Sequence, residues 1–279
     1  MADDKLPEVI EGWRGQKIAG ARSRGAAVFA AVDWREMVLD SAGDIETKAA
    51  DVAGRAAAWF APEAFTLLTS VSGRYSNVQS INSEDTVTWA AFGPRASARA
   101  VGAIVDLAFG AQSRPEQWSR LFWERSTHPH TQKTTGGPEP DVTLCAENGW
   151  CYVIEAKWAA DLDDKQGKDG DMTQLEMRAD VARRLATEPS KRGVLVIAPG
   201  PERYPAVKRG TFAKYFAVDG NRYVPRDAAR ALEARVLTWE QIVDVLARTD
   251  GPSELIDYLK WRLARLPLTA TCDSCASCD

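Results

Sequence analysis

The chain has 279 residues, 45% of them hydrophobic and 27% charged, which is enough for one large α/β domain or two small ones. The net charge of −4 excludes a protein that attracts nucleic acid through an overall positive field, so a polyanionic partner would need a local basic patch. No apolar run approaches the roughly 20 residues of a membrane span. The segment Met1-Ala2-Asp3-Asp4-Lys5 does not resemble a signal peptide, so we expect a cytoplasmic protein without a membrane partner.

The N-terminal quarter of the chain differs in composition from the rest. Residues 1–31 are rich in Gly, Ala and Arg and predict a loosely ordered basic arm, while spaced apolar residues over 32–68 predict helices. We therefore treat residues 1–70 as a separate N-terminal region. A polar stretch over 72–83 predicts a loop.

Helices are expected next. Ser83 can cap a helix that carries acids in its first turn and stops at Gly93-Pro94. Further helices are predicted over 95–109 and 115–125. The polar loop that follows contains His128 and His130, which either bind metal or act as a general base, or are ordinary loop residues.

A β-hairpin is the clearest local signal of the chain. Two short apolar runs, 142–146 and 151–154, are separated by Glu147-Asn148-Gly149-Trp150, and Asn-Gly between β-prone runs is typical of a hairpin turn. The remaining predicted elements are a helix over 171–186, a buried strand over 194–198, sheet or hairpin over 211–224, and helices over 238–248 and 252–265. Alternating helices and buried strands predict an α/β fold.

Acids and a lysine lie at the open end of this hairpin. Pro140-Asp141 opens its first strand and Glu155-Ala156-Lys157 closes its second. Strand side chains alternate, so Glu155 and Lys157 point the same way, and antiparallel pairing brings Asp141 beside Glu155. Two carboxylates suit Mg²⁺, and an ammonium can position or deprotonate a metal-bound water or neutralise charge on a reacting phosphate.

The pattern Pro140-Asp141 … Glu155-Ala156-Lys157 resembles the PD-(D/E)xK nuclease superfamily, over about residues 83–198. The resemblance implies a restriction-endonuclease-like fold, with a mixed β-sheet flanked by helices and an N-terminal helical elaboration. It also implies an upstream acid, for which Glu84 is the candidate, and a helix carrying a Gln that faces the site. Gln174 lies 17 residues after Lys157, and Arg178 follows one turn later on the same face.

The resemblance implies a metal-dependent nuclease domain over residues 71–267. Glu84, Asp141 and Glu155 would hold Mg²⁺, for which Mn²⁺ would substitute, Lys157 would orient the attacking water, and Gln174 would help fix the water or the lysine. The expected substrate is DNA, cut as by an endonuclease, with RNA left open. A role in defence against foreign DNA or in repair follows from the resemblance alone, with a homodimer or partner subunits as alternatives for assembly.

A basic segment over 203–226 carries six Lys and Arg against one acid, interleaved with aromatic residues. This mixture suits a nucleic-acid track, although the aromatic residues fit a core better. Arg183 and Arg184 could extend the patch, or form a solvated helix face. The residues assigned to nucleic-acid binding are Arg178, Lys208, Arg209 and Lys214.

Three of the five cysteines lie in the last eight residues, as Cys272-x-x-Cys275-x-x-Cys278, which argues against a disulfide framework. This is half of a zinc or iron–sulfur signature, and we favour an unstructured tail over 268–279. Two alternatives to a nuclease stay open. One is a non-catalytic DNA-binding or assembly subunit that retains the fold, and the other is a metal-binding or redox protein built on the tail.

Overall fold

The structure is a computed structural model, and its described residues are 9–11, 17–19, 84–93, 96–110, 115, 117–122, 138–146, 148–158, 160–163, 165–166, 170–204, 210–249, 251 and 253–266. The helices expected over 32–68, both histidines, Lys208, Arg209 and the cysteine tail lie outside these residues. Within the N-terminal arm, β1 (Val9–Glu11) and β2 (Lys17–Ala19) form a short antiparallel pair. In the described ranges, no helix is long and apolar enough to cross a membrane.

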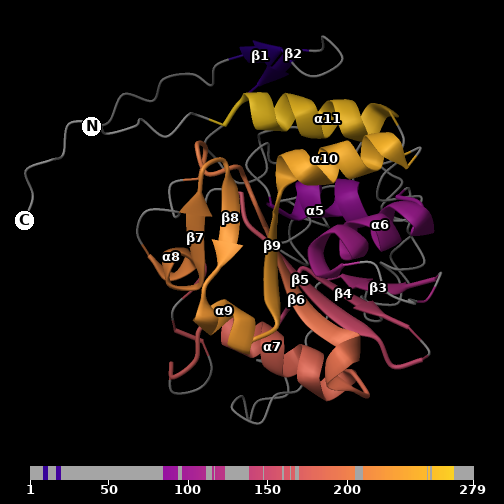
Figure 1. Cartoon of the computed structure of the whole chain (residues 1–279). Helices are drawn as coiled ribbons and strands as arrows, with labels where there is room; N and C mark the ends of the chain where they lie inside the picture. The colour runs from indigo at the N-terminus through magenta and orange to yellow at the C-terminus, as the bar shows by residue number, and fades with distance from the viewer. Residues whose placement is uncertain are drawn as a thin grey trace, which may run out of the picture.

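A mixed five-stranded sheet forms the centre of the molecule (Figure 1), which confirms the α/β class and the helix-flanked mixed sheet. Its strand order is β3-β4-β5-β6-β9, antiparallel between the first three strands and parallel from β5 to β9. The strand bounds are β3 Ser119–Phe122, β4 Val142–Cys145, β5 Cys151–Ala156, β6 Arg192–Ala198 and β9 Ala234–Thr238.

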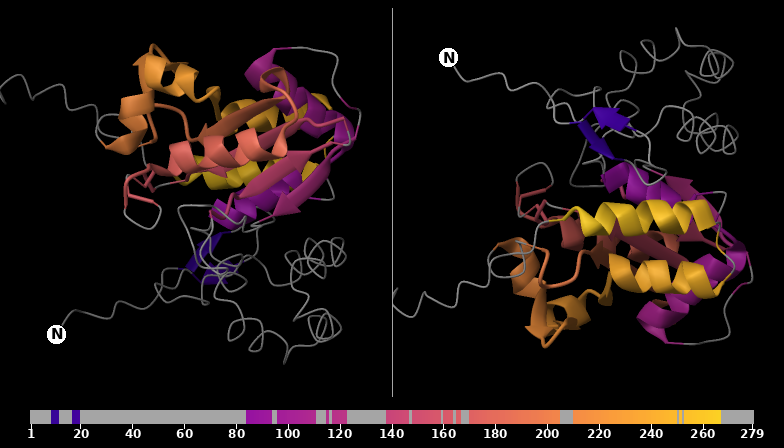
Figure 2. Two further views of the ribbon diagram at one scale, coloured as in Figure 1. Left: turned by 90° about the horizontal axis from the view of Figure 1, so that it is seen from below. Right: turned by 90° about the horizontal axis from the view of Figure 1, so that it is seen from above.

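Helices cover both faces of the sheet, which explains why every residue of β5 is buried. One face packs on α5 (Glu84–Phe92), α6 (Ala98–Phe109), α10 (Trp239–Arg248) and α11 (Ser253–Ala264). Figure 2 shows α10 and α11 side by side in this layer. The other face packs on α7 (Gln174–Leu185), α8 (Thr211–Tyr215), α9 (Asp227–Ala231) and the hairpin of β7 (Phe216–Asp219) and β8 (Arg222–Pro225).

Strand alternation divides β5 between these two layers. Tyr152 and Ile154 join the core beneath α5, α6, α10 and α11, whereas Cys151 and Val153 pack under α7. Glu155 follows the α7 side of this alternation. The catalytic candidates of β5 are therefore placed under α7 by the same pattern that builds the core.

Several local signals form the elements that the sequence predicts. The hairpin turn between β4 and β5 uses Gly149 at φ +82°, a conformation that favours glycine. Thr238 caps α10 in a reciprocal capping box with Gln241. The helix predicted over 171–186 forms as α7, which starts at Gln174 because Thr173 caps it in the same way with Glu176.

Two predictions of secondary structure are wrong. The helix expected over 115–125 is replaced by β3, which pairs with β4 and whose Arg120 donates hydrogen bonds to three carbonyls at the end of α5 and just beyond it. Sheet was expected throughout 211–224, but its first five residues form α8. Asp161 accepts hydrogen bonds from the Thr211 and Phe212 amides and so satisfies the first turn of this helix. Both differences arise from contacts distant in sequence.

Candidate active site

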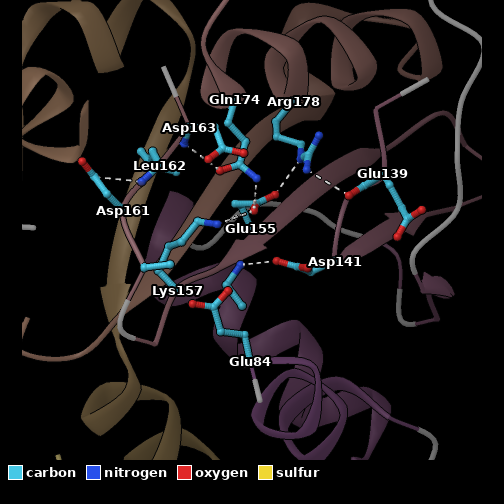
Figure 3. A network of polar contacts seen from close by, with 12 residues as sticks. Glu84, Glu139, Asp141, Glu155, Lys157, Asp161, Leu162, Asp163, Gln174 and Arg178 are labelled. Atoms are coloured by element: carbon cyan, nitrogen blue, oxygen red, sulfur yellow. Dashed lines mark hydrogen bonds and ion pairs between the residues drawn. The ribbon is translucent and has the colours of Figure 1, made fainter. Parts of the chain in front are cut away.

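The open end of the β4–β5 hairpin brings Asp141 and Glu155 together. Val142 pairs with Ile154, so the next position in the same register places Asp141 opposite Glu155. The Asp141 carboxylate is turned toward the backbone of β5, where its Oδ2 accepts a hydrogen bond of 2.7 Å from the Ala156 amide (Figure 3). The juxtaposition predicted from the hairpin is therefore present.

Glu155 is the centre of a buried polar network and is only 2% exposed. One oxygen, Oε1, lies 3.0 Å from Lys157 Nζ and accepts a 2.6 Å hydrogen bond from Gln174 Nε2. The other, Oε2, accepts a 2.6 Å bond from Arg178 Nε, and Arg178 Nη2 continues to the Glu139 carbonyl at 2.9 Å. Figure 3 shows these side chains converging on Glu155 from β5 and α7. Both carboxylate oxygens are thus engaged.

The charges of this network hold each other in their ionised forms. Burial alone would raise the pKa of Glu155, but Arg178 and Lys157 lower it below its ordinary value. Burial would likewise lower the pKa of Lys157, yet the carboxylates of Glu155, Glu84 and Asp141 raise it well above its ordinary value. At neutral pH the site therefore contains a carboxylate and an ammonium.

Asp141 and Glu84 occupy equivalent positions along the exposed backbone edge of β5. Lys157 donates its amide to β6, so the amides of Ala156 and Trp158 point toward the β4 side, beyond the first pair of that ladder. Asp141 accepts from Ala156, and Glu84 Oε1 accepts from Trp158 at 2.7 Å. Glu84 reaches this edge from the start of α5, so two elements distant in sequence supply acids to one end of β5.

Gln174 links Glu155 to the loop that follows β5. Its amide oxygen accepts from the Asp163 amide at 3.3 Å, and its own backbone amide donates to the Asp163 carbonyl at 2.8 Å. The capping box at Thr173 fixes this first turn of α7. Gln174 contacts the carboxylate rather than the lysine, so its predicted place beside the site is confirmed but its contact differs.

Two residues that support Lys157 were missed by sequence reasoning. Trp239 Nε1 donates a 2.9 Å hydrogen bond to the Lys157 carbonyl, and the Arg262 guanidinium lies 4.6 Å from the ring centroid of Trp158. Trp158 packs in the core on the side of α10 and α11, as expected of a residue that faces away from Lys157. No local signal marks Trp239 or Arg262, because their contacts join residues more than 80 positions apart.

The residues assigned to nucleic-acid binding are separated by the fold. Arg178 is buried beside Glu155, whereas Lys214 is exposed at the end of α8. Arg183 and Arg184 are exposed on α7, where Arg184 pairs with Asp180. The aromatic residues of the basic segment are core, as favoured: Tyr204, Phe212, Tyr215, Phe216 and Tyr223 are all buried in one cluster.

Oxygen ligands of the kind that Mg²⁺ prefers are present, but they are turned to partners within the protein. Among the residues that the structure describes, no three Asp, Glu, His or Cys side chains are grouped as a metal site. Asp141 and Glu84 bond to backbone amides, and Glu155 bonds to Lys157, Gln174 and Arg178. The donor set suits a hard cation by chemistry, and binding would require these carboxylates to exchange partners.

No protein-family model matches the chain, and no curated protein or solved structure is significantly similar to it. The functional argument therefore depends on the residues and the geometry of this site.

Proposed function

We propose that the chain is a metal-dependent nuclease whose active site lies at the open end of the β4–β5 hairpin. One observation carries the proposal. Asp141, Glu155 and Lys157 converge there on adjacent strands, and Glu84 from α5 and Gln174 from α7 approach the same end of β5. Five polar groups from four elements exceed what solubility of a hairpin end requires, and two of them, Glu155 and Lys157, are buried at a cost in solvation.

Asp141, Glu155 and Glu84 are the proposed ligands of Mg²⁺, with Mn²⁺ as a substitute. A bound cation would supply Lewis-acid stabilisation of a phosphate and a more acidic water. Its positive charge would offset the loss of one amide or ammonium contact at each carboxylate, because a hard cation prefers anionic oxygen. Gln174 can then keep Glu155 oriented through its Nε2 atom, which needs no charge to do so.

Lys157 is proposed to stabilise negative charge on the substrate as an ammonium. The surrounding carboxylates raise its pKa well above neutrality, so it carries its proton and cannot serve as a general base in this state. A protonated amine close to the ligands can instead donate a hydrogen bond to a phosphate oxygen or to the attacking water. This narrows the two roles that the sequence left open to one.

The mixed sheet with helices on both faces is compatible with a restriction-endonuclease-like core, and we propose that fold assignment with the function. The substrate proposed is DNA, cut internally, in defence or repair, with RNA as the alternative substrate. Lys214, exposed at the end of α8, is the described basic residue proposed to contact the backbone of the nucleic acid.

A panel of substrates tests the activity. Purified chain is incubated with supercoiled plasmid, linear duplex, single-stranded DNA and RNA, each with Mg²⁺, Mn²⁺ or EDTA. The proposal expects cleavage of at least the plasmid with Mg²⁺ or Mn²⁺ and none with EDTA. Cleavage that persists in EDTA, or an inert protein with every substrate and metal, would contradict it.

A second candidate function is a non-catalytic DNA-binding subunit. One observation favours it: both oxygens of Glu155 are already occupied by Lys157, Gln174 and Arg178, as in a structural ion pair. Binding of plasmid that is unaffected by Mg²⁺ and never followed by cleavage would favour this alternative.

A further inference from the structure

Two cysteines face each other across the same hairpin, at the end opposite the candidate active site. Cys145 of β4 pairs directly with Cys151 of β5, and their Sγ atoms are 4.0 Å apart. Ala146 donates its amide to the Trp150 carbonyl at 3.1 Å, so the neighbouring pair of cysteines is a non-hydrogen-bonded pair of the ladder. At such pairs the Cα atoms lie about 4.5 Å apart, within the range of about 4.4–6.8 Å that disulfides span.

The two thiols differ in access. Cys151 is fully buried and packs with Val153 and Val181 beneath α7, whereas Cys145 is partly exposed. Cys145 also lines a hollow of about 560 Å³ together with Trp118 and Ser119 of the neighbouring segment. A small oxidant from solvent can therefore reach Cys145 first, while Cys151 is held behind it.

Their hydrogen bond also separates the acidities of the two thiols. It lowers the pKa of Cys145, because a thiol donor at Cys151 stabilises the Cys145 thiolate, and it raises the pKa of Cys151, in addition to the effect of burial. The thiolate is the reactive form of cysteine. The more accessible sulfur is thus also the more nucleophilic one.

We propose that Cys145 and Cys151 form a reversible disulfide when the protein meets hydrogen peroxide, with Cys145 as the attacking thiol and Cys151 as the resolving thiol. This inference is independent of the proposed nuclease activity. Intracellular disulfides of this kind are typically transient rather than structural.

The reaction balances in two steps. The Cys145 thiolate attacks one peroxide oxygen, the O–O bond breaks, and the sulfenic acid forms while the released hydroxide takes up the thiol proton as water. The Cys151 sulfur then attacks the Cys145 sulfur, the S–S bond forms, the S–O bond breaks, and the Cys151 proton leaves with the hydroxide as a second water. Peroxide accepts the two electrons that the thiols lose.

The test uses the full chain with its tail cysteines replaced, Cys272→Ser, Cys275→Ser and Cys278→Ser, so that only the hairpin pair remains. Hydrogen peroxide should reduce the free thiols from two per chain to none, and a reductant should restore both. The oxidised protein should stay monomeric by mass if the reduced protein is, because the bond forms within one chain.

Peptide mapping identifies the bond. No Lys or Arg lies between Cys145 and Cys151, but a glutamyl endopeptidase cuts after Glu147 and separates them. Combined with trypsin, it should release two peptides that remain joined until reductant is added. Separate peptides from the oxidised protein, or a link between two chains, would overturn the proposal.

Single variants separate the two roles. In the tail-free protein, Cys151→Ala should accumulate a sulfenic acid at Cys145 that a dimedone probe traps, whereas Cys145→Ala should yield little adduct at buried Cys151. In the reduced parent, Cys145 should be alkylated about tenfold faster than Cys151 or more. Equal alkylation rates, or trapping at Cys151 alone, would overturn the assignment of the attacking thiol.

Discussion

Replacing Arg178 with Met removes the strongest support of Glu155 while keeping much of the volume of the side chain. The Arg178–Glu155 pair is 2.6 Å long and its side chains are 5% and 2% exposed, so neither group can regain its solvation when the other is lost. Losing one partner of such a buried pair costs about 3–5 kcal/mol. We therefore expect the free energy of unfolding to fall by that amount.

The matched control lies on the same helix. Arg184 pairs with Asp180 at an equally short 2.6 Å, but its side chain is 44% exposed and the pair is screened by solvent. Arg184→Met should therefore cost only about 0.3–0.5 kcal/mol. Urea denaturation followed by circular dichroism measures both variants, and an unchanged slope with denaturant excludes a difference in the unfolded state.

The difference between wild type and Arg178→Met should depend on pH. In the wild type, Arg178 and Lys157 lower the folded pKa of Glu155, so the stability that this group contributes is present above its unfolded pKa of about 4.3 and is lost as the pH falls through the folded pKa. Without Arg178 that folded pKa rises, so the stability gap should narrow in acid. A cost equal to that of Arg184→Met, or a gap independent of pH, would refute the buried-pair reasoning.

Three further predictions concern the site, the basic segment and the hairpin turn. Lys157→Ala should cut turnover on the order of 10²–10⁴-fold with metal affinity nearly unchanged, Lys157→Arg should not restore it, and Gln174→Ala should cost roughly 10–100-fold, as single-turnover cleavage will measure. Reversing Lys208 and Arg209 to Glu should weaken DNA binding and flatten its salt dependence by about 0.9 per lost phosphate contact; an unchanged slope would assign the DNA track elsewhere. Gly149→Ala should lower the unfolding free energy by about 1–3 kcal/mol in a thermal melt, because φ is +82° and the new Cβ would lie 2.2 Å from a threonine hydroxyl; an unchanged melt would contradict this.

The sequence predicts those features that depend on neighbouring residues. The Asn-Gly turn, strand alternation and the acids at the hairpin ends are local, and together they place Asp141 opposite Glu155 without knowledge of the rest of the fold. The start of α10 at Thr238 is local for the same reason, since the capping box spans only four residues.

Features that depend on distant contacts could not be read in this way. Residues 115–125 have a composition compatible with a helix, yet pairing with β4 makes their centre a strand. Arg178 looks like a surface arginine of an amphipathic helix, and only the packing of α7 against β5 shows that it is buried beside Glu155. Tertiary contacts override local propensity at both places.

The central claim is that the acids of this site carry out metal-dependent cleavage, and Asp141→Asn tests it most directly. Asn keeps an oxygen that can accept the Ala156 amide, so the fold should remain, but it removes the charge that a metal ligand needs. The measurement is cleavage of supercoiled plasmid in Mg²⁺ beside Asp227→Asn, whose parent carboxylate is 97% exposed and far along the chain. We predict that Asp141→Asn abolishes cleavage while Asp227→Asn leaves it unchanged; wild-type cleavage by Asp141→Asn would contradict the account.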